Sequence, residues 1–205
     1  MAKSVDARDL KSLDSNIVPV RVRPAAPEKS KSYGLLFSYS HFQKEDDCMD
    51  RETIISRLTS GDYTSMRDFA DIILADSQFS DKWYEYLDTF TSLLDHPESR
   101  VRSYAFYIIA ANTKWDKEDR FDSVFPAFVG HITDEDSMSA RQCINALAEI
   151  CIYKPKYIPH IIDVFRKADL SKYTSKEIAL IRNDMYTTEC TLFKNKSSYT
   201  PIKGE

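Results

Sequence analysis

The chain has 205 residues and only four glycines, where average usage would give about 14. This shortage excludes the glycine-rich phosphate loop, the dinucleotide fingerprint and the nucleophile elbow, because each needs glycine for a sharp turn or a close backbone approach. With 28 basic and 32 acidic residues, the net charge is −4 at pH 7. Such a charge gives no general attraction to nucleic acid or to anionic lipid.

The first 48 residues form a polar stretch without a sustained hydrophobic period, and Pro19, Pro24 and Pro27 interrupt it. This composition predicts a flexible N-terminal arm over residues 1–48. One segment of the arm differs, because residues 33–42 are strongly apolar and aromatic. An exposed patch of this kind is sticky in water. We therefore expect the segment either to pack back on the folded part or to bind a partner.

From about residue 50 onward, apolar residues recur at intervals of three and four, which is the spacing of one face of an α-helix. The series begins with Ile54 and Leu58 and continues to Met185 and Cys190. The connections are short, and they carry Ser, Asp and Glu where a side chain can cap the first amides of a helix. We expect an all-α domain over residues 49–195, followed by a C-terminal tail over 196–205.

The helical region contains an internal repeat. Residues 61–75 align without gaps on residues 96–110, and further shifts of 39 and 41 residues continue the series. Self-similarity at a period of this length is the signature of a repeat architecture. The polar positions that recur in this register are Arg67, Asp95, Arg102, Asp134, Arg141 and Arg182.

Between the arginine-bearing helices lie second helices of a different type, which we expect over residues 83–95, 121–134 and 156–169. Pro126 and Pro159 stand in the first turns of two of them, where the missing amide is tolerated. Helix pairs that repeat every 35 to 41 residues have the dimensions of an α-solenoid. The sequence thus predicts a right-handed α–α superhelix of about four helix pairs.

The run 95–105, the spacing of Asp134 and Arg141, and the proline-apolar starts of the second helices resemble HEAT repeats, which form armadillo-type solenoids. The resemblance covers about residues 50–193. A closer similarity to small bacterial HEAT-like proteins is carried by residues 110–116 and 140–147. The resemblance implies stacked helix pairs that present a curved surface.

The aspartates and arginines that stand seven residues apart, Asp95 with Arg102 and Asp134 with Arg141, are expected to be structural. At a turn between repeats, the five donors of an arginine can satisfy helix-end carbonyls and the aspartate of the neighbouring repeat. None of the four cysteines and four histidines has the spacing of a metal site. We therefore expect no metal, no cofactor and no catalytic residue.

A stiff curved surface without convergent catalytic groups favours a non-catalytic protein–protein interaction or scaffold module. Its partner would be another protein or a peptide, bound on a concave side lined by the second helices. The polar positions expected there are Lys82, Tyr84, Glu85, Asp88, Asp122, Ser123 and Asp163. Since no run of residues has the length of a membrane span or the pattern of a signal peptide, we expect a cytoplasmic location without membrane contact.

Nucleic acid is the alternative ligand, because DNA-alkylation-repeat glycosylases are also built from HEAT-like helix pairs and use aromatic and acidic residues against a damaged base. Trp115, Asp116 and Arg120 would be the corresponding residues here. The acidic net charge argues against this alternative, since phosphate contacts need a basic face. A protein partner is the leading hypothesis.

Overall fold

The computed structural model describes residues 49–197. The predicted arm over residues 1–48, with its apolar segment 33–42, and nearly all of the predicted tail lie outside the described residues. The described part is helical, with no strand between residues 49 and 197, which confirms the all-α prediction. Within the same part, no helix combines the length and the apolar character needed to cross a membrane.

Eight α-helices and four 3₁₀ turns follow one another along residues 49–197. The α-helices are α2 (Arg51–Leu58), α3 (Tyr63–Ser77), α4 (Leu87–Ser92), α5 (Ser99–Asn112), α6 (Phe121–Gly130), α7 (Ser137–Tyr153), α8 (Ile158–Lys167) and α9 (Ser175–Ser197). The 3₁₀ turns are η1 (Lys82–Tyr86), η2 (Thr113–Trp115), η3 (His131–Thr133) and η4 (Pro155–Tyr157).

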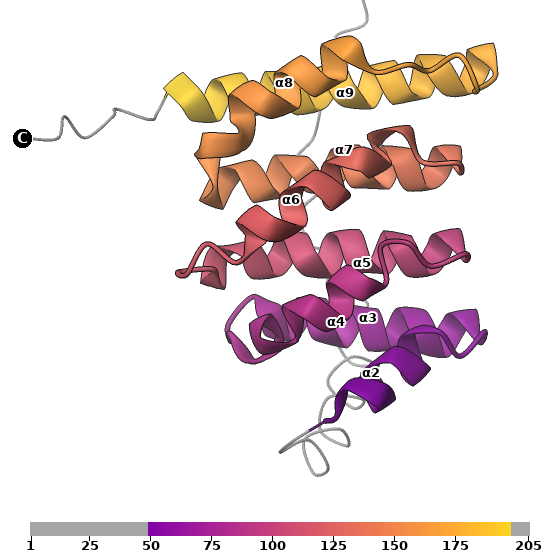
Figure 1. Ribbon diagram of the computed structural model, residues 1–205, viewed down its shortest axis with the longest axis vertical. Coiled ribbons are helices and arrows are strands. Elements are labelled where there is room, and N and C mark those ends of the chain that lie inside the picture. The colour runs from indigo at the N-terminus through magenta and orange to yellow at the C-terminus, as the bar shows by residue number, and fades with distance from the viewer. Residues whose placement is uncertain (1–48, 198–205) are drawn as a thin grey trace, which may run out of the picture. The chain divides into compact units, whose positions relative to one another are not determined.

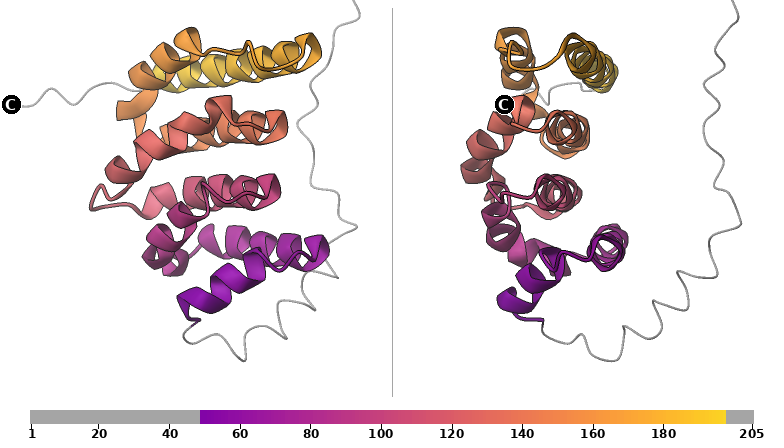
Figure 2. Two further views of the ribbon diagram at one scale, coloured as in Figure 1. Left: turned by 45° about the vertical axis from the view of Figure 1, so that its right-hand side comes forward. Right: turned by 90° about the vertical axis from the view of Figure 1, so that its right-hand side faces the viewer.

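The helices lie in two layers (Figure 1). Helices α3, α5, α7 and α9 lie side by side in chain order and form what we call the inner layer, and α2, α4, α6 and α8 form the outer layer. Neighbours within the inner layer pack directly on one another, α3 on α5, α5 on α7 and α7 on α9. The edge-on view in Figure 2 shows that the stack is slightly bowed, with the inner layer on the inner side of the bow.

At the predicted connections, side-chain oxygens accept hydrogen bonds from backbone amides at the starts of several helices. The carboxylate of Asp116 accepts hydrogen bonds from the amides of Arg120 and Phe121 at 2.8 and 3.2 Å, at the start of α6. Before α9, the amide of Thr174 donates to the Glu177 carboxylate at 2.9 Å, and the amide of Glu177 donates back to the Thr174 hydroxyl at 3.4 Å. These bonds satisfy amides that a helix start leaves free.

Apolar residues at the predicted three-and-four spacing form the core between the layers. Phe69 and Ile73 of α3 and Ile144 of α7 are fully or almost fully buried, and each such side chain contributes about 1.5–3 kcal/mol to stability. Phe106 of α5 packs edge to face on Phe128 of α6, with the ring centroids 5.3 Å apart. The layers are therefore joined by an aromatic and aliphatic interface.

All three predicted second helices differ in detail from the structure, since each consists of an α-helix and a 3₁₀ turn. The segment predicted as one helix over 83–95 consists of η1 and the short helix α4, and Trp83 and Tyr86 of η1 pack on each other with ring centroids 6.0 Å apart. A 3₁₀ turn places residues three apart on the same side. In α6, Pro126 lies inside the helix and not in its first turn, whereas Pro159 lies in the first turn of α8 as predicted.

Candidate functional site

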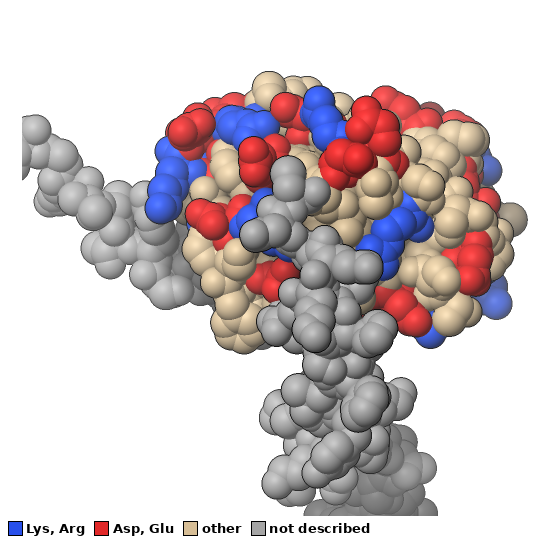
Figure 3. All heavy atoms as spheres, turned by 90° about the horizontal axis from the view of Figure 1, so that it is seen from below, with Lys and Arg blue, Asp and Glu red and all other residues tan. Residues whose placement is uncertain are grey.

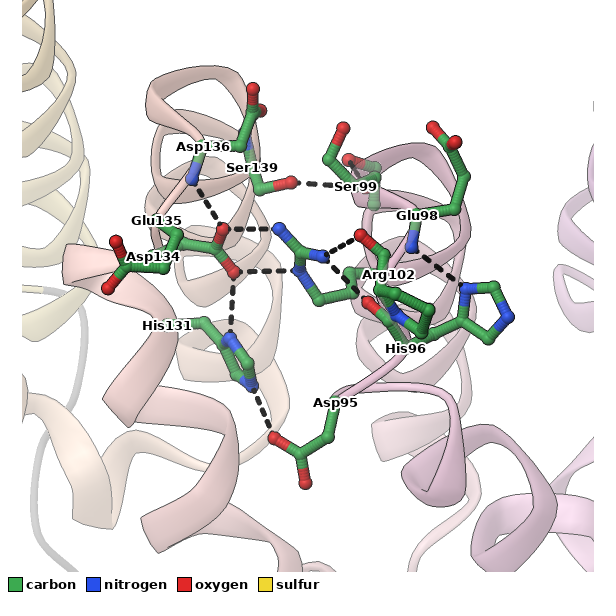
Figure 4. Close-up of polar contacts among 12 residues, drawn as sticks. Asp95, His96, Glu98, Ser99, Arg102, His131, Asp134, Glu135, Asp136 and Ser139 are labelled. Carbon is green, nitrogen blue, oxygen red and sulfur yellow. Dashed lines mark hydrogen bonds and ion pairs between the residues drawn. The ribbon is translucent and has the colours of Figure 1, made fainter.

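Arg102 of α5 is the centre of the polar cluster in Figure 4. Its Nε and Nη2 donate to the two carboxylate oxygens of Asp134 at 2.9 and 2.5 Å. Its Nη1 donates to the backbone carbonyls of His96 and Pro97 at 2.6 and 3.1 Å. The side chains of Arg102 and Asp134 are 10% and 3% exposed. The guanidinium therefore ties the connection before α5 to the connection before α7.

The Asp134 carboxylate accepts further hydrogen bonds besides those from Arg102. The Nδ1 of His131 lies 2.9 Å from it, and the amide of Asp136 donates to it at 2.9 Å. On the other side of the imidazole, Nε2 of His131 lies 3.7 Å from the exposed carboxylate of Asp95. Burial alone would raise the pKa of Asp134, but the hydrogen bonds from His131 and Arg102 outweigh it and hold that pKa well below its usual range.

The other arginines of the repeat register have different surroundings. Arg141 of α7 donates from Nε to Asp184 at 2.6 Å, and Asp184 lies within α9, not in the connection before it. The side chain of Arg67 is 62% exposed. Arg182 is exposed as well, and no described helix pair follows it. The arginine contact between successive helix pairs, seen in full at Arg102, is therefore not a property of the repeat register alone.

A second polar network lies at the opposite ends of the inner helices, just after α5 and α7. Lys154 donates to the backbone carbonyl of Asp116 at 2.6 Å and to the carboxylate of Asp119 at 2.7 Å, and its Nζ is 3.0 Å from the Asp116 carboxylate. Lys156 donates to Asp119 at 3.0 Å and to Asp122 at 2.8 Å. We call these five residues the lysine network.

Two tyrosines extend the lysine network to the outer layer. The hydroxyl of Tyr84 in η1 donates to Asp116 at 2.6 Å, and that of Tyr157 in η4 donates to Asp122. Burial and the neighbouring carboxylate raise the pKa of both phenols, so both remain hydrogen-bond donors at neutral pH. Asp119 adopts a positive φ of 56°, which is uncommon for a residue other than glycine. The network thus connects η1, the start of α6, and η4.

The seven polar positions expected on the concave side lie elsewhere in the structure. They belong to η1, α4, α6 and α8, and these elements lie on the outer side of the bow in Figure 2. The arginine-bearing helices, and not the second helices, form the inner layer. This placement corrects the expectation for Lys82, Tyr84, Glu85, Asp88, Asp122, Ser123 and Asp163.

Most of these positions already have contacts within the chain. Besides Tyr84 and Asp122 of the lysine network and its extension, Asp88 pairs with Arg120 at 3.1 Å. The exposed ammonium of Lys167 lies 2.7 Å from Asp163, one helical turn away. Their side chains therefore brace the outer layer.

The three residues of the nucleic-acid alternative are also held by internal contacts. The indole Nε1 of Trp115 donates to the carbonyl of Ser77 at 3.0 Å, and the Asp116 side chain is 0% exposed. The carboxylate of Asp116 therefore has no free surface against which a base could lie. At the end of the stack that carries α2, basic and acidic side chains are intermixed on the part that grey atoms leave visible (Figure 3).

Two hollows open beside the connections that precede α5 and α7. The larger, of about 860 Å³, surrounds the Arg102 cluster and is lined by acidic residues that include Asp95, Glu98 and Glu135. The smaller, of about 480 Å³, lies between α5 and α7 and is called the inner hollow below. It is lined by Ser99, Arg100, Ser103, Tyr104, Tyr107, Asp136, Met138 and Gln142.

Gln142, one of the residues that line the inner hollow, has an unsatisfied acceptor in its side chain. The side-chain oxygen Oε1 of Gln142 is buried and has no hydrogen-bond partner, a state that costs free energy unless a donor is supplied. Arg100 lies 3.9 Å above the ring of Tyr63, which holds the guanidinium at the rim. Burial raises the pKa of both Tyr104 and Tyr107, so their hydroxyls stay protonated. Sequence reasoning missed this hollow, because its lining depends on how α5 and α7 pack.

Acid should destabilise the protein through the paired carboxylates. Hydrogen bonds from Lys154 and Lys156 lower the pKa of Asp119 from 3.8 to about 2, and the pKa values of Asp116 and Asp134 are lowered too. A carboxyl group whose pKa is lower in the folded state contributes stability that is complete above its unfolded pKa and is lost as pH falls through the folded value. We therefore expect the melting temperature to fall between about pH 4 and pH 2.

The measurement is thermal unfolding followed by circular dichroism at a series of pH values. Because an asparagine at position 119 does not titrate, the Asp119→Asn variant should lose less of its melting temperature over this interval than the unaltered chain. A melting temperature that stays constant down to pH 2 would contradict the role of these carboxylates.

Among the residues that the structure describes, no group of three His, Cys, Asp or Glu side chains is placed so that it could hold a metal ion. Cys143 and Cys151 are buried, and burial raises the pKa of both thiols. Such thiols are poor nucleophiles and poor metal ligands, because the thiolate is the reactive form.

Comparisons with protein families, with curated proteins and with solved structures find no match to this chain. What the protein does is therefore inferred from its own residues and their geometry.

Proposed function

We propose that the folded part of the chain is a HEAT-like α-solenoid that acts without catalysis as a protein-interaction or scaffold module. The stacking of helix pairs in chain order and the 35-to-41-residue register support this class. The alternating layers follow from helices that are apolar on one face only. A cytoplasmic location suits a protein of this kind and belongs to the same proposal.

The observation that carries the proposal is the contrast between buried charged groups, which are paired within the chain, and the side chains of the inner hollow, which are open. The buried charged groups that could serve as acids or bases, Asp134 and Asp116 above all, are paired with Arg102 and Lys154 on neighbouring helix pairs. A catalytic group must instead be free to reach a substrate. The inner hollow, by contrast, offers side chains that are open to a ligand.

The chemistry of the inner hollow suits a segment of another protein. Tyr and Arg are the residue types that contribute most to protein interfaces, since they combine apolar area with directed hydrogen bonds. Tyr104 and Tyr107 supply rings and hydroxyl donors, and Arg100 supplies a positive charge at the rim. The partner we propose is a protein that inserts an extended segment here.

The test compares two matched charge reversals in the full-length chain. Arg100→Glu changes the rim of the inner hollow, whereas Arg166→Glu makes the same change on the exposed outer helix α8. Tagged wild-type chain and both variants are used to capture proteins from native lysate, and the captured proteins are quantified. We expect at least one protein whose recovery falls about tenfold with Arg100→Glu and is unchanged with Arg166→Glu.

The melting temperatures of both variants are measured to check that they are folded. Recovery of the same proteins by all three chains, or of none above background, would contradict the proposal. Salt-dependent binding of duplex DNA by the wild-type chain would instead favour a nucleic-acid ligand.

A further inference from the structure

Helix α9 is the last helix of the described stack, and one of its faces packs on α7. Ile181 is fully buried on this face. Asp184 pairs with Arg141 of α7 at 2.6 Å, and the hydroxyl of Thr188 donates to the carbonyl of Ile144 of α7 at 3.4 Å. These contacts fix the rotation of α9 about its own axis.

The opposite face of α9 carries a stripe of small, aromatic and thiol side chains. An α-helix turns by about 100° per residue, so positions spaced by four, three, four and three residues from 179 lie on the side away from Ile181. In this stripe, Tyr186 is 67% exposed and Phe193 is 49% exposed. No described helix follows α9 to cover them. The residues of this face, called the α9 stripe, are Ala179, Asn183, Tyr186, Cys190 and Phe193.

The α9 stripe is complementary to itself. Its spacing is symmetric about Tyr186, since Ala179 and Phe193 lie seven residues before and after it. If two copies pack antiparallel about a two-fold axis at Tyr186, the small Ala179 of one copy lies opposite the large Phe193 of the other. Contacts of this kind, in which the same patch serves on both subunits, are the rule in two-fold dimers.

The charges beside the stripe specify the same arrangement. Arg182 and Glu189 are seven residues apart and lie on one flank of the stripe, four residues before and three after Tyr186. Antiparallel packing places Arg182 of each copy beside Glu189 of the other, so the pair forms twice. Parallel packing would instead place this flank of the two copies on opposite sides of the contact, so Arg182 of one copy and Glu189 of the other would not meet.

We propose that α9 pairs with α9 of a second copy of this chain and forms an antiparallel, two-fold dimer centred on Tyr186. A helix of 23 residues offers about 35 Å of contact length. The dimer buries the exposed rings of the α9 stripe and matches the two charged positions. It uses the end of the described stack that α9 forms and leaves the inner hollow open.

The proposal is tested by sedimentation velocity of the full-length chain over a range of concentrations from micromolar upward. The wild-type chain should pass from monomer to dimer. Arg182→Glu and Glu189→Arg should each raise the dissociation constant by about tenfold, because symmetry places like charges together at two points. The double variant Arg182→Glu with Glu189→Arg should restore the wild-type constant, since the reversed pairs are again opposite.

Tyr186→Lys is a second variant that should abolish the dimer, and its exposed position should leave the melting temperature of the monomer unchanged. A chain that stays monomeric at every concentration would overturn the proposal. The finding that another segment or another protein covers α9 would overturn it as well. A dimer that none of these substitutions weakens would overturn it too, because the contact would then lie elsewhere. The capture experiment on Arg100 is independent of all these outcomes.

Discussion

Replacing Arg102 by alanine should lower the free energy of unfolding by about 3–5 kcal/mol, the usual result when one member of a buried ion pair is removed. The cost arises because the Asp134 carboxylate, 3% exposed, would lose two of its donors and stay desolvated. The carbonyls of His96 and Pro97 would lose their donor as well. Urea unfolding followed by helical circular dichroism measures the change.

Arg67→Ala provides a matched control, because Arg67 occupies the same place in the repeat register but its side chain is 62% exposed. Its effect should stay within about 0.5 kcal/mol. Replacing both buried partners, Arg102→Met with Asp134→Leu, should cost less than Arg102→Ala alone, since no uncompensated charge is left. If Arg102→Ala and Arg67→Ala had equal effects, the Arg102–Asp134 contact would not be important for stability.

Replacing Lys154 by methionine should cost about 3 kcal/mol, because it leaves the fully enclosed Asp116 carboxylate without its positive partner. Two forces act on this carboxylate. Burial alone would raise the pKa of Asp116, and the hydrogen bonds from Tyr84 and Lys154 more than offset it. Removal of Lys154 takes away one of these compensating contacts, so the pKa of Asp116 should rise and the variant should lose stability at neutral pH.

Lys156→Met is the control for this prediction, because the Lys156 side chain is 44% exposed and its carboxylate partners are more than half exposed. Surface pairs of this kind contribute less than about 1 kcal/mol. Asp116→Asn in the Lys154→Met background should recover part of the loss, since the amide carries no charge to desolvate. The two single variants are compared by their urea midpoints, and a larger loss in Lys156→Met would contradict the assignment.

The helices could be predicted from the sequence because their signal is local. Apolar residues at intervals of three and four define each helix, and residues such as Asp116 and Glu177 define starts. The register also pointed to Arg102, whose contacts are those expected for an arginine at a turn between repeats. These features depend on residues close in sequence or on one repeat period.

The burial of the site residues and the placing of the two layers depend on packing between helices, which the pattern of apolar residues does not reveal. Arg67 and Arg182 share the register of Arg102 but are exposed. Which layer lies on the inner side is set by the curvature of the whole stack, so the expected binding residues fell on the outer layer. The burial of Lys154 could not be predicted from the sequence for another reason. A lysine in a polar connection suggests a solvated side chain. Only the approach of the connection that carries Asp116, 38 residues earlier, buries Lys154.

The two buried ion pairs have a consequence for how such a chain can change over evolution. Asp134 is paired with an arginine 32 residues earlier, and Asp116 with a lysine 38 residues later, so each charge has its counterpart on a neighbouring helix pair. Deletion or duplication of one helix pair would bring a buried charge against a surface that lacks its oppositely charged partner, at a cost of several kcal/mol. The two ion pairs therefore act against the insertion or loss of a helix pair at these two junctions.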